Sequence, residues 1–116
     1  METIEERVGR LEYYKRIFVE MVDKERFPFY YLMVENDLTE EEVEEVYALC
    51  EHLNQQLEEQ RDSGLLNYTS LLIHFVGMLN VKLNPEVTIQ ALYKQGYYQP
   101  LMLRLRSLIE EIDNYE

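Results

Sequence analysis

Apolar residues recur at steps of three and four along nearly the whole chain, and this spacing limits the possible fold more than any other feature. Such steps place side chains on one face of an α-helix, whereas a half-buried strand requires strict alternation. The chain contains no strand-like alternation, no internal repeat and no low-complexity linker. The sequence therefore predicts an all-α protein.

The first half of the chain is predicted to contain two long helices separated by a short one. The first helix runs from about residue 2 to residue 24, and one of its faces is apolar along its length: Ile4, Val8, Leu11, Tyr14, Phe18 and Met21. Pro28 then starts a short apolar helix within FPFYYLMVEN, since proline is tolerated in the first turn of a helix but not in its interior.

The second long helix has the clearest boundaries. Thr39 followed by Glu42 is a capping box, in which the two side chains bond free amides at the helix start. Gly64 can adopt the left-handed conformation that ends a helix. Between these boundaries an apolar seam repeats with coiled-coil spacing: Val43, Val46, Cys50, Leu53 and Leu57.

The second half of the chain is predicted to form three further helices. The segment from about residue 67 to residue 80 is apolar most of the way round, which is typical of a central buried helix. A fifth helix has Asn84 as its cap and Pro85 in its first turn and ends at Gly96, and a sixth follows Pro100. We expect a single all-helical domain over residues 1–116, a compact bundle of five to six helices in which the two long helices pack around the apolar central helix.

The charge of the chain is strongly negative and unevenly distributed. The net charge is −12, with 18 acidic and 7 basic residues in positions 1–63 and 5 and 4 in positions 64–116. Phosphate binding needs a basic stripe, so direct binding to nucleic acid is disfavoured. The single Cys50 excludes an internal disulfide. The first ten residues, METIEERVGR, lack the apolar run of a secretory signal. The most apolar segment, LLIHFVGML, is about half the length of a membrane span. We therefore expect a cytoplasmic protein with no membrane segment.

Three segments of the chain resemble a known group of bacterial proteins. TEEEVEEVYALCEHL, LLNYTSLLIHFVGMLN and especially LNPEVTIQALYKQGYYQPLM are similar to the small uncharacterised YhaI proteins of Bacillus-type bacteria, and the resemblance covers the whole chain. It implies an all-helical domain in a cytoplasmic bacterial protein. Because the shared residues are those of helix boundaries and packing, the resemblance implies no activity and transfers no site residue.

No group of residues in the sequence specifies a chemistry. His52 and His74 lie on separate predicted helices, and neither completes the Glu-x-x-His pattern of a di-metal bundle, because Leu49 and Leu71 stand three positions earlier. Cys50 falls on an apolar seam without a neighbouring cation, so we expect it to pack as a small hydrophobe. The four glycines are too scattered for a phosphate-binding loop. We therefore assign no catalytic, cofactor-binding or metal-ligating residue and expect no cofactor.

One acidic pattern supports an alternative as an enzyme. Glu41, Glu42 and Glu45 read E-E-x-x-E, and Glu59 with Asp62 reads E-x-x-D, which is similar to the Mg²⁺-binding signature of the all-α nucleoside-triphosphate pyrophosphohydrolases. In that family the two halves lie on facing helices, whereas here they lie at opposite ends of one predicted helix, about 21 Å apart. Only an antiparallel pairing of this helix in a dimer, or a break in the helix, would bring the two halves together.

The remaining features favour a small acidic helical module that binds an unidentified protein partner, with regulation as one role. An acidic mimic of nucleic acid that occupies a basic partner is the other alternative. Ten tyrosines occur, several as neighbours, and neighbours on a helix point about 100° apart, so some aromatic surface must lie at the rim of the core. Two coiled-coil stripes in so small a chain favour a two-fold homodimer, with contact through either Leu53 or Leu11 and Phe18.

Overall fold

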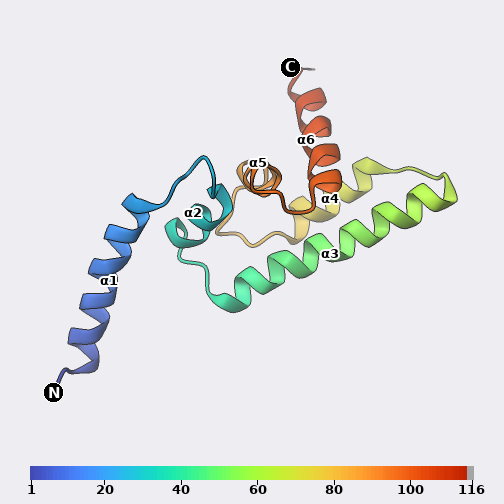
Figure 1. Ribbon diagram of the computed structural model, residues 1–116. Helices are drawn as coiled ribbons and strands as arrows, with labels where there is room; N and C mark the ends of the chain where they lie inside the picture. Colours follow the sequence, from blue (N-terminus) through green and yellow to red (C-terminus); the bar gives the residue numbers. More distant parts are fainter. Residues whose placement is uncertain (115–116) are drawn as a thin grey trace.

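The computed structural model describes residues 1–114, which form six α-helices and no strand. In chain order these are α1 (Ile4–Met21), α2 (Pro28–Glu35), α3 (Glu40–Ser63), α4 (Tyr68–Met78), α5 (Pro85–Gln95) and α6 (Gln99–Asn114) (Figure 1). The predicted all-α bundle of five to six helices is confirmed. No helix among these residues combines the length and the apolarity needed to cross a membrane.

Polar side chains and glycines define several helix boundaries. Thr39 accepts a hydrogen bond from the backbone N–H of Glu42, and the Glu42 carboxylate accepts one from the N–H of Thr39, so the predicted capping box is present. Asn84 caps α5 through its side chain, also as predicted. Gly64 and Gly96 end α3 and α5 with φ angles of 77° and 89°, in the left-handed region that favours glycine.

α1 ends at Met21, before the predicted boundary near residue 24. The Asp23 carboxylate accepts hydrogen bonds from the backbone N–H groups of Glu25 and Arg26. Such local bonds offer the backbone an alternative to helical hydrogen bonds. The chain therefore turns over residues 22–27 before Pro28 starts the next helix.

α2 to α6 share one hydrophobic core. α3 packs against α4 and α6, α5 packs against α2 and α6, and α4 packs against α6. Each of these five helices contributes fully buried side chains, among them Phe29, Leu53, Phe75, Ile89, Leu92, Leu101 and Leu105. The seam predicted along α3 lies in this core through four of its residues: Val46, Cys50, Leu53 and Leu57.

The prediction that α4 is the buried centre of the fold is wrong. Leu71, Leu72 and Phe75 are buried, but Ile73 and Val76 on the outer face are 67% and 47% exposed. The first turns of α6 bury Leu101, Met102 and Leu105 and this helix contacts α3, α4 and α5, whereas its C-terminal part projects from the core (Figure 1). An apolar sequence shows that a helix lacks a polar face, but it does not show that every side is covered.

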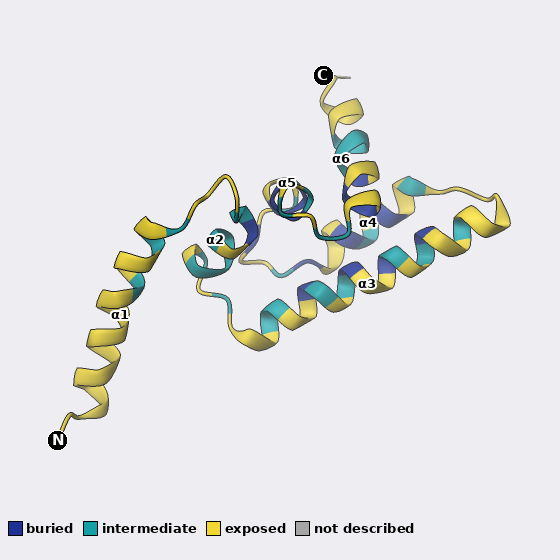
Figure 2. Ribbon diagram, in the orientation of Figure 1, coloured by how far each residue is buried: buried dark blue, intermediate teal, exposed yellow. Residues whose placement is uncertain are grey.

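The expected packing of the first long helix around the core is also wrong. α1 buries none of its residues, packs mainly against α2 and extends away from the other helices (Figure 2). The molecule consequently measures 63 × 27 × 23 Å. The core closes without α1, because Phe29, Phe75 and Leu105 are already 0% exposed. Helical spacing identifies an apolar face but not the surface that covers it.

Candidate functional site

α1 carries a long stripe of exposed apolar side chains. Leu11, Phe18 and Met21 are 53%, 59% and 72% exposed, and Ile4 in the first turn is 80% exposed. Their spacing places them on one face of the helix. We define the α1 stripe as this face: Ile4, Val8, Leu11, Tyr14, Phe18 and Met21. Contiguous apolar surface of this kind marks interaction sites.

The α1 stripe lies on a helix without net charge. α1 contains four glutamates and four lysines or arginines, whereas the whole chain has a net charge of −12. The negative charge of the molecule is therefore carried outside α1. Two copies of the chain that approach through α1 would bring neutral helices together, with less electrostatic repulsion than an approach through the acidic α3.

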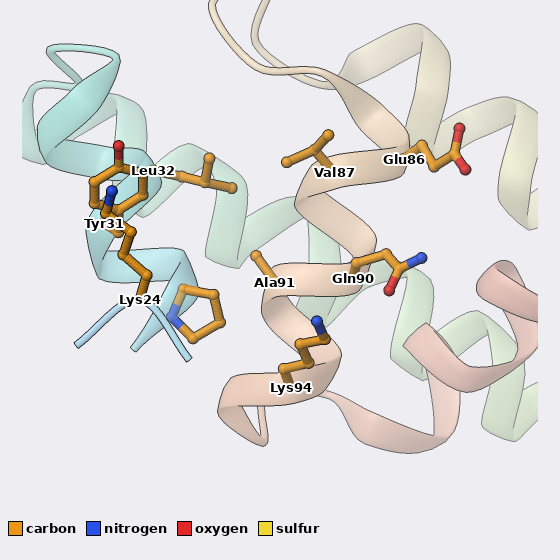
Figure 3. A pocket seen from close by; sticks show the side chains of 9 residues that line it. Lys24, Tyr31, Leu32, Glu86, Val87, Gln90, Ala91 and Lys94 are labelled. Atoms are coloured by element: carbon orange, nitrogen blue, oxygen red, sulfur yellow. The ribbon is translucent and has the colours of Figure 1, made fainter. Parts of the chain in front are cut away.

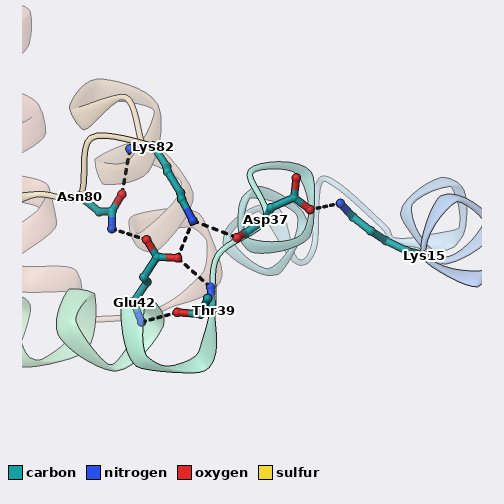
Figure 4. A network of polar contacts seen from close by, with 6 residues as sticks. All are labelled: Lys15, Asp37, Thr39, Glu42, Asn80 and Lys82. Atoms are coloured by element: carbon teal, nitrogen blue, oxygen red, sulfur yellow. Dashed lines mark hydrogen bonds and ion pairs between the residues drawn. The ribbon is translucent and has the colours of Figure 1, made fainter. Parts of the chain in front are cut away.

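α1 is attached to the rest of the molecule through its C-terminal half. Lys15 forms an ion pair with Asp37 in the α2–α3 link (Figure 4), and Val19 and Val22 are half-buried. Residues 4–11, in contrast, are exposed at every position. The N-terminal half of α1 is therefore open to a partner on all sides.

A polar network joins the start of α3 to the α4–α5 link (Figure 4). The Glu42 carboxylate lies 2.6 Å from the Nζ atom of Lys82 and accepts a hydrogen bond of 2.8 Å from the Asn80 side chain. The hydrogen bonds from Lys82, from the Thr39 N–H and from Asn80 lower the pKa of Glu42 to about 2. Glu42 therefore holds two segments of the fold together.

A groove of about 420 Å³ lies between α2 and α5 (Figure 3), and we call it the α2–α5 groove. Its lining is mainly apolar and includes Pro28, Leu32, Val87 and Ala91, with three charged residues: Lys24, Lys94 and Glu86. The Nζ atom of Lys24 lies 4.6 Å from the Tyr31 ring centroid, a cation–π contact that orients the lysine. Lys94 comes from the facing wall. The sequence did not predict this groove, because no spacing relates the α1–α2 link to the last turn of α5.

Aromatic side chains gather where α2, α3 and the α5–α6 link meet. The Phe29 ring centroid lies 5.7 Å from that of Tyr47 and 6.3 Å from that of Tyr97. The hydroxyl oxygens of Tyr30 and Tyr97 are 2.7 Å apart, and this hydrogen bond raises the pKa of Tyr30. Of the exposed tyrosines, Tyr30 lies at the rim of the core, as expected, whereas Tyr13 and Tyr14 are exposed on α1, away from the core.

His52 and His74 lie together across α3 and α4, with ring centroids 5.5 Å apart, a contact that the sequence did not predict. Within residues 1–114, no group of three or more His, Cys, Asp or Glu side chains is arranged to hold a metal ion. Cys50 packs in the core, as predicted, and burial raises the pKa of its thiol to about 12. The thiol is therefore protonated at neutral pH and is a poor nucleophile.

The acidic pattern of the enzyme alternative is not assembled within one molecule. α3 runs unbroken from Glu40 to Ser63, so Glu45 and Glu59 lie about 21 Å apart along the helix. The break in this helix that would have brought the carboxylates together is absent. Glu42, one member of the pattern, is bonded to Lys82 and Asn80. The pattern is that of an amphipathic helix with an acidic outer face.

A family model described as a protein of unknown function, DUF1878, matches residues 1–110 of the chain. The matched region contains all of α1 to α5 and most of α6, so it includes both the α1 stripe and the α2–α5 groove. The match confirms the expected membership of an uncharacterised protein family. The chain belongs to the DUF1878 family of proteins of unknown function.

Proposed function

We propose that this chain is a small acidic helical module for protein interaction and that it associates with a second copy of itself through α1. The observation that carries the proposal is the exposure of the α1 stripe, in which every side chain is at least 43% exposed. A stripe of this length, at coiled-coil spacing, is a natural contact for another helix. Its apolar character makes burial in a partner favourable.

A second copy is the partner that best fits this stripe. A two-fold axis makes one apolar stripe complementary to itself, so the same surface of both copies can meet in a closed dimer. The net charge of −12 opposes the approach of two copies, but charges separated by more than about 8 Å are largely screened at physiological salt. Because α1 itself is neutral, the repulsion along this helix is smaller than along α3, which has nine acidic residues and one arginine.

We further propose that residues 1–116 act as one domain in the cytoplasm of a Bacillus-type bacterium, in line with the resemblance to the YhaI proteins. The family match over residues 1–110 supports a single unit. The single, buried Cys50 suits a reducing compartment, in which disulfides are rare. Regulation of a bound protein is one role that such a module can serve.

A second candidate function, mimicry of nucleic acid, is favoured by the outer face of α3. This face carries a row of exposed carboxylates: Glu40, Glu41, Glu44, Glu45, Glu51, Glu58 and Glu59. Such a row can steer a basic partner toward the helix. Mimicry of nucleic acid through α3 does not explain why the apolar α1 stripe is exposed, and we therefore prefer self-association.

Leu11→Glu and Tyr13→Glu form a matched pair of variants that tests self-association. Both wild-type side chains are 53% exposed, but they lie about 200° apart around the helix, so only Leu11 belongs to the α1 stripe. In sedimentation equilibrium, we expect Leu11→Glu to be a monomer and Tyr13→Glu to remain a dimer. Circular dichroism should show the same helix content for both variants, because neither side chain is buried.

Two outcomes would contradict the proposal. A dimer that tolerates Leu11→Glu as well as Tyr13→Glu would mean that the α1 stripe is not the contact. A wild-type monomer that displaces DNA from a basic DNA-binding protein would favour the mimicry function instead. Substitution of Glu44 and Glu51 by glutamine should then weaken this displacement, whereas Leu11→Glu should not.

A further inference from the structure

α1 is too short to hold two molecules together by pairing with its copy alone. The helix has 18 residues, between two and three heptads, whereas self-standing coiled coils sustain their apolar pattern over about three to four heptads or more. Most of the stability of a helix in a protein also comes from the packing of its apolar face and not from its intrinsic propensity. A dimer through α1 therefore needs additional contact surface on the body of the partner.

The α2–α5 groove lies where such additional contact would be made. Lys24, which lies on its edge, follows the last residue of α1, Met21, by three positions. In an antiparallel pair of helices, the first turns of one α1 lie beside the last turns of the other. We propose that residues 2–8 of a second copy, which include the first turn of its α1, dock into the α2–α5 groove, an inference that rests on the self-association proposed above.

The charge of the groove fits this occupant. Its lining has two lysines and one glutamate, a net charge of +1 on a chain of net charge −12. A neighbouring groove between α1, α2 and α3 contains Lys15, Asp37 and Glu40 and has a net charge of −1. Residues 2–8 carry three glutamates and one arginine, which gives them a net charge of −2. The acidic start of α1 is therefore attracted to the α2–α5 groove and not to its neighbour.

The two lysines of the groove are available for this contact. Neither Lys24 nor Lys94 forms an ion pair within residues 1–114, although acidic residues outnumber basic ones by 23 to 11 in the chain. Tyr31 holds Lys24 against the α2 wall, and Lys94 faces it from α5 (Figure 3). An acidic segment that lies between the walls would meet both ammonium groups.

The apolar surfaces of the groove and of the docking segment also match. Val87 is 49% exposed on the α5 wall, and Pro28, Leu32 and Ala91 contribute further apolar lining. The docking segment presents Ile4 and Val8, which are 80% and 45% exposed. Burial of these two side chains against the groove adds to the apolar contact between the other residues of the two α1 stripes. A two-fold axis repeats the arrangement, so each copy both donates α1 and receives it.

Disulfide trapping between two single-cysteine variants tests the docking. In a Cys50→Ala background, Ile4→Cys and Val87→Cys are purified separately, one with a larger tag, and mixed under mild oxidation. We expect a cross-linked species that contains both tags, and no cross-link from either variant alone. Val81→Cys, which replaces a fully exposed valine in the α4–α5 link, is the matched control and should give no cross-link with Ile4→Cys.

The possible cross-links separate this inference from the self-association on which it rests. A cross-link between two Ile4→Cys chains, without one to Val87→Cys, would show a parallel pair of α1 helices and overturn the docking while self-association stands. Equal cross-linking to Val87→Cys and Val81→Cys would show random collision and would also overturn it. If the wild-type chain were a monomer in sedimentation equilibrium, the proposed self-association itself would be wrong, and the docking with it.

Charge reversal provides a second measurement that does not depend on cysteine geometry. The double variant Lys24→Glu/Lys94→Glu places like charges opposite the start of the partner α1, and we expect its dimer dissociation constant to rise about tenfold or more. Arg61→Glu is the control, because it reverses one charge at an exposed site near the end of α3 that does not line the groove. We expect it to raise the dimer dissociation constant much less. If each reversed charge raised the dimer dissociation constant equally in the two variants, the docking would be overturned. Mixing Lys24→Glu/Lys94→Glu with Glu5→Lys/Glu6→Lys restores opposite charges across the contact, and recovery of affinity in this mixture would support the docking.

Discussion

Lys82 and Glu42 join two segments that lie far apart in the sequence, since the Nζ atom of Lys82 is 2.6 Å from Oε1 of Glu42. The same carboxylate accepts a hydrogen bond from the N–H of Thr39 and thereby caps α3. The ion pair consequently fixes the start of the longest helix against the link between α4 and α5. Glu42 therefore acts at once as a helix cap and as a tertiary contact.

The stability contributed by Glu42 should depend on pH. Its folded-state pKa of about 2 is below the ordinary value of 4.5, so its stabilising effect is fully present above pH 4.5 and is lost as pH falls toward 2. We expect Glu42→Gln to be less stable than the wild type at neutral pH and the difference to shrink steadily below pH 4.5. Urea denaturation across this range measures the difference. Glu44→Gln, at an exposed position of the same helix, is the control and should show a small difference from the wild type.

Leu53 and Leu11, the two alternative contacts predicted from the sequence, should respond in opposite ways to substitution by glutamate. Leu53 is 0% exposed in the core of its own molecule, so Leu53→Glu would bury an unpaired carboxylate and should cost more than about 4 kcal/mol. We expect this variant to lose its helical circular dichroism or its cooperative unfolding, whereas Leu11→Glu stays folded. A folded, monomeric Leu53→Glu would place the dimer contact on α3 and contradict the assignment to α1.

Substitutions on the two faces of α4 should separate its buried side from its exposed side. Phe75 is 0% exposed, and Phe75→Ala should lower the free energy of unfolding by roughly 3 to 5 kcal/mol. Ile73 is 67% exposed, so Ile73→Ala should change the free energy of unfolding by less than about 1 kcal/mol. Glu44→Ala, on the exposed face of α3, should change the free energy of unfolding by at most about 0.5 kcal/mol. Chemical denaturation of the three variants measures these losses. Similar losses for Phe75→Ala and Ile73→Ala would mean that α4 is covered on both sides.

Cys50 should be unreactive in the folded protein. Burial raises the pKa of its thiol to about 12, and the side chain is 0% exposed, so an aromatic disulfide reagent meets neither a thiolate nor an accessible sulfur. We expect the thiol to react at pH 8 only as fast as the protein unfolds, and at once in denaturant. Rapid labelling of the folded protein at a rate independent of its stability would contradict the burial of Cys50.

The sequence predicted the helices well because their boundaries depend on local interactions. The capping box of Thr39 and Glu42, the cap at Asn84 and the glycine at position 64 each act within a few residues of the chain. The end of α1 was misplaced because the Asp23 carboxylate bonds the next backbone amides, a competing local interaction that apolar spacing does not reveal.

The positions of the helices relative to one another could not be predicted in the same way. α1 and α3 carry similar apolar stripes, yet Leu53 is buried and Leu11 is exposed. An apolar stripe identifies the helix face that can be buried, but it does not identify the helix or the partner that covers this face. The α2–α5 groove was missed for a related reason. Lys24 and Lys94 approach one pocket only after α2 has packed against α5, a contact between segments far apart in the chain.

Sedimentation equilibrium of the wild-type chain at low and at high salt is the most direct test of association through α1. An interface dominated by the apolar stripe should persist or tighten as salt rises, because screening weakens the repulsion between two chains of net charge −12 more than it weakens apolar contact. We therefore predict a species of twice 14.1 kDa at tens of micromolar in both conditions. A species of 14.1 kDa in both conditions would contradict the account.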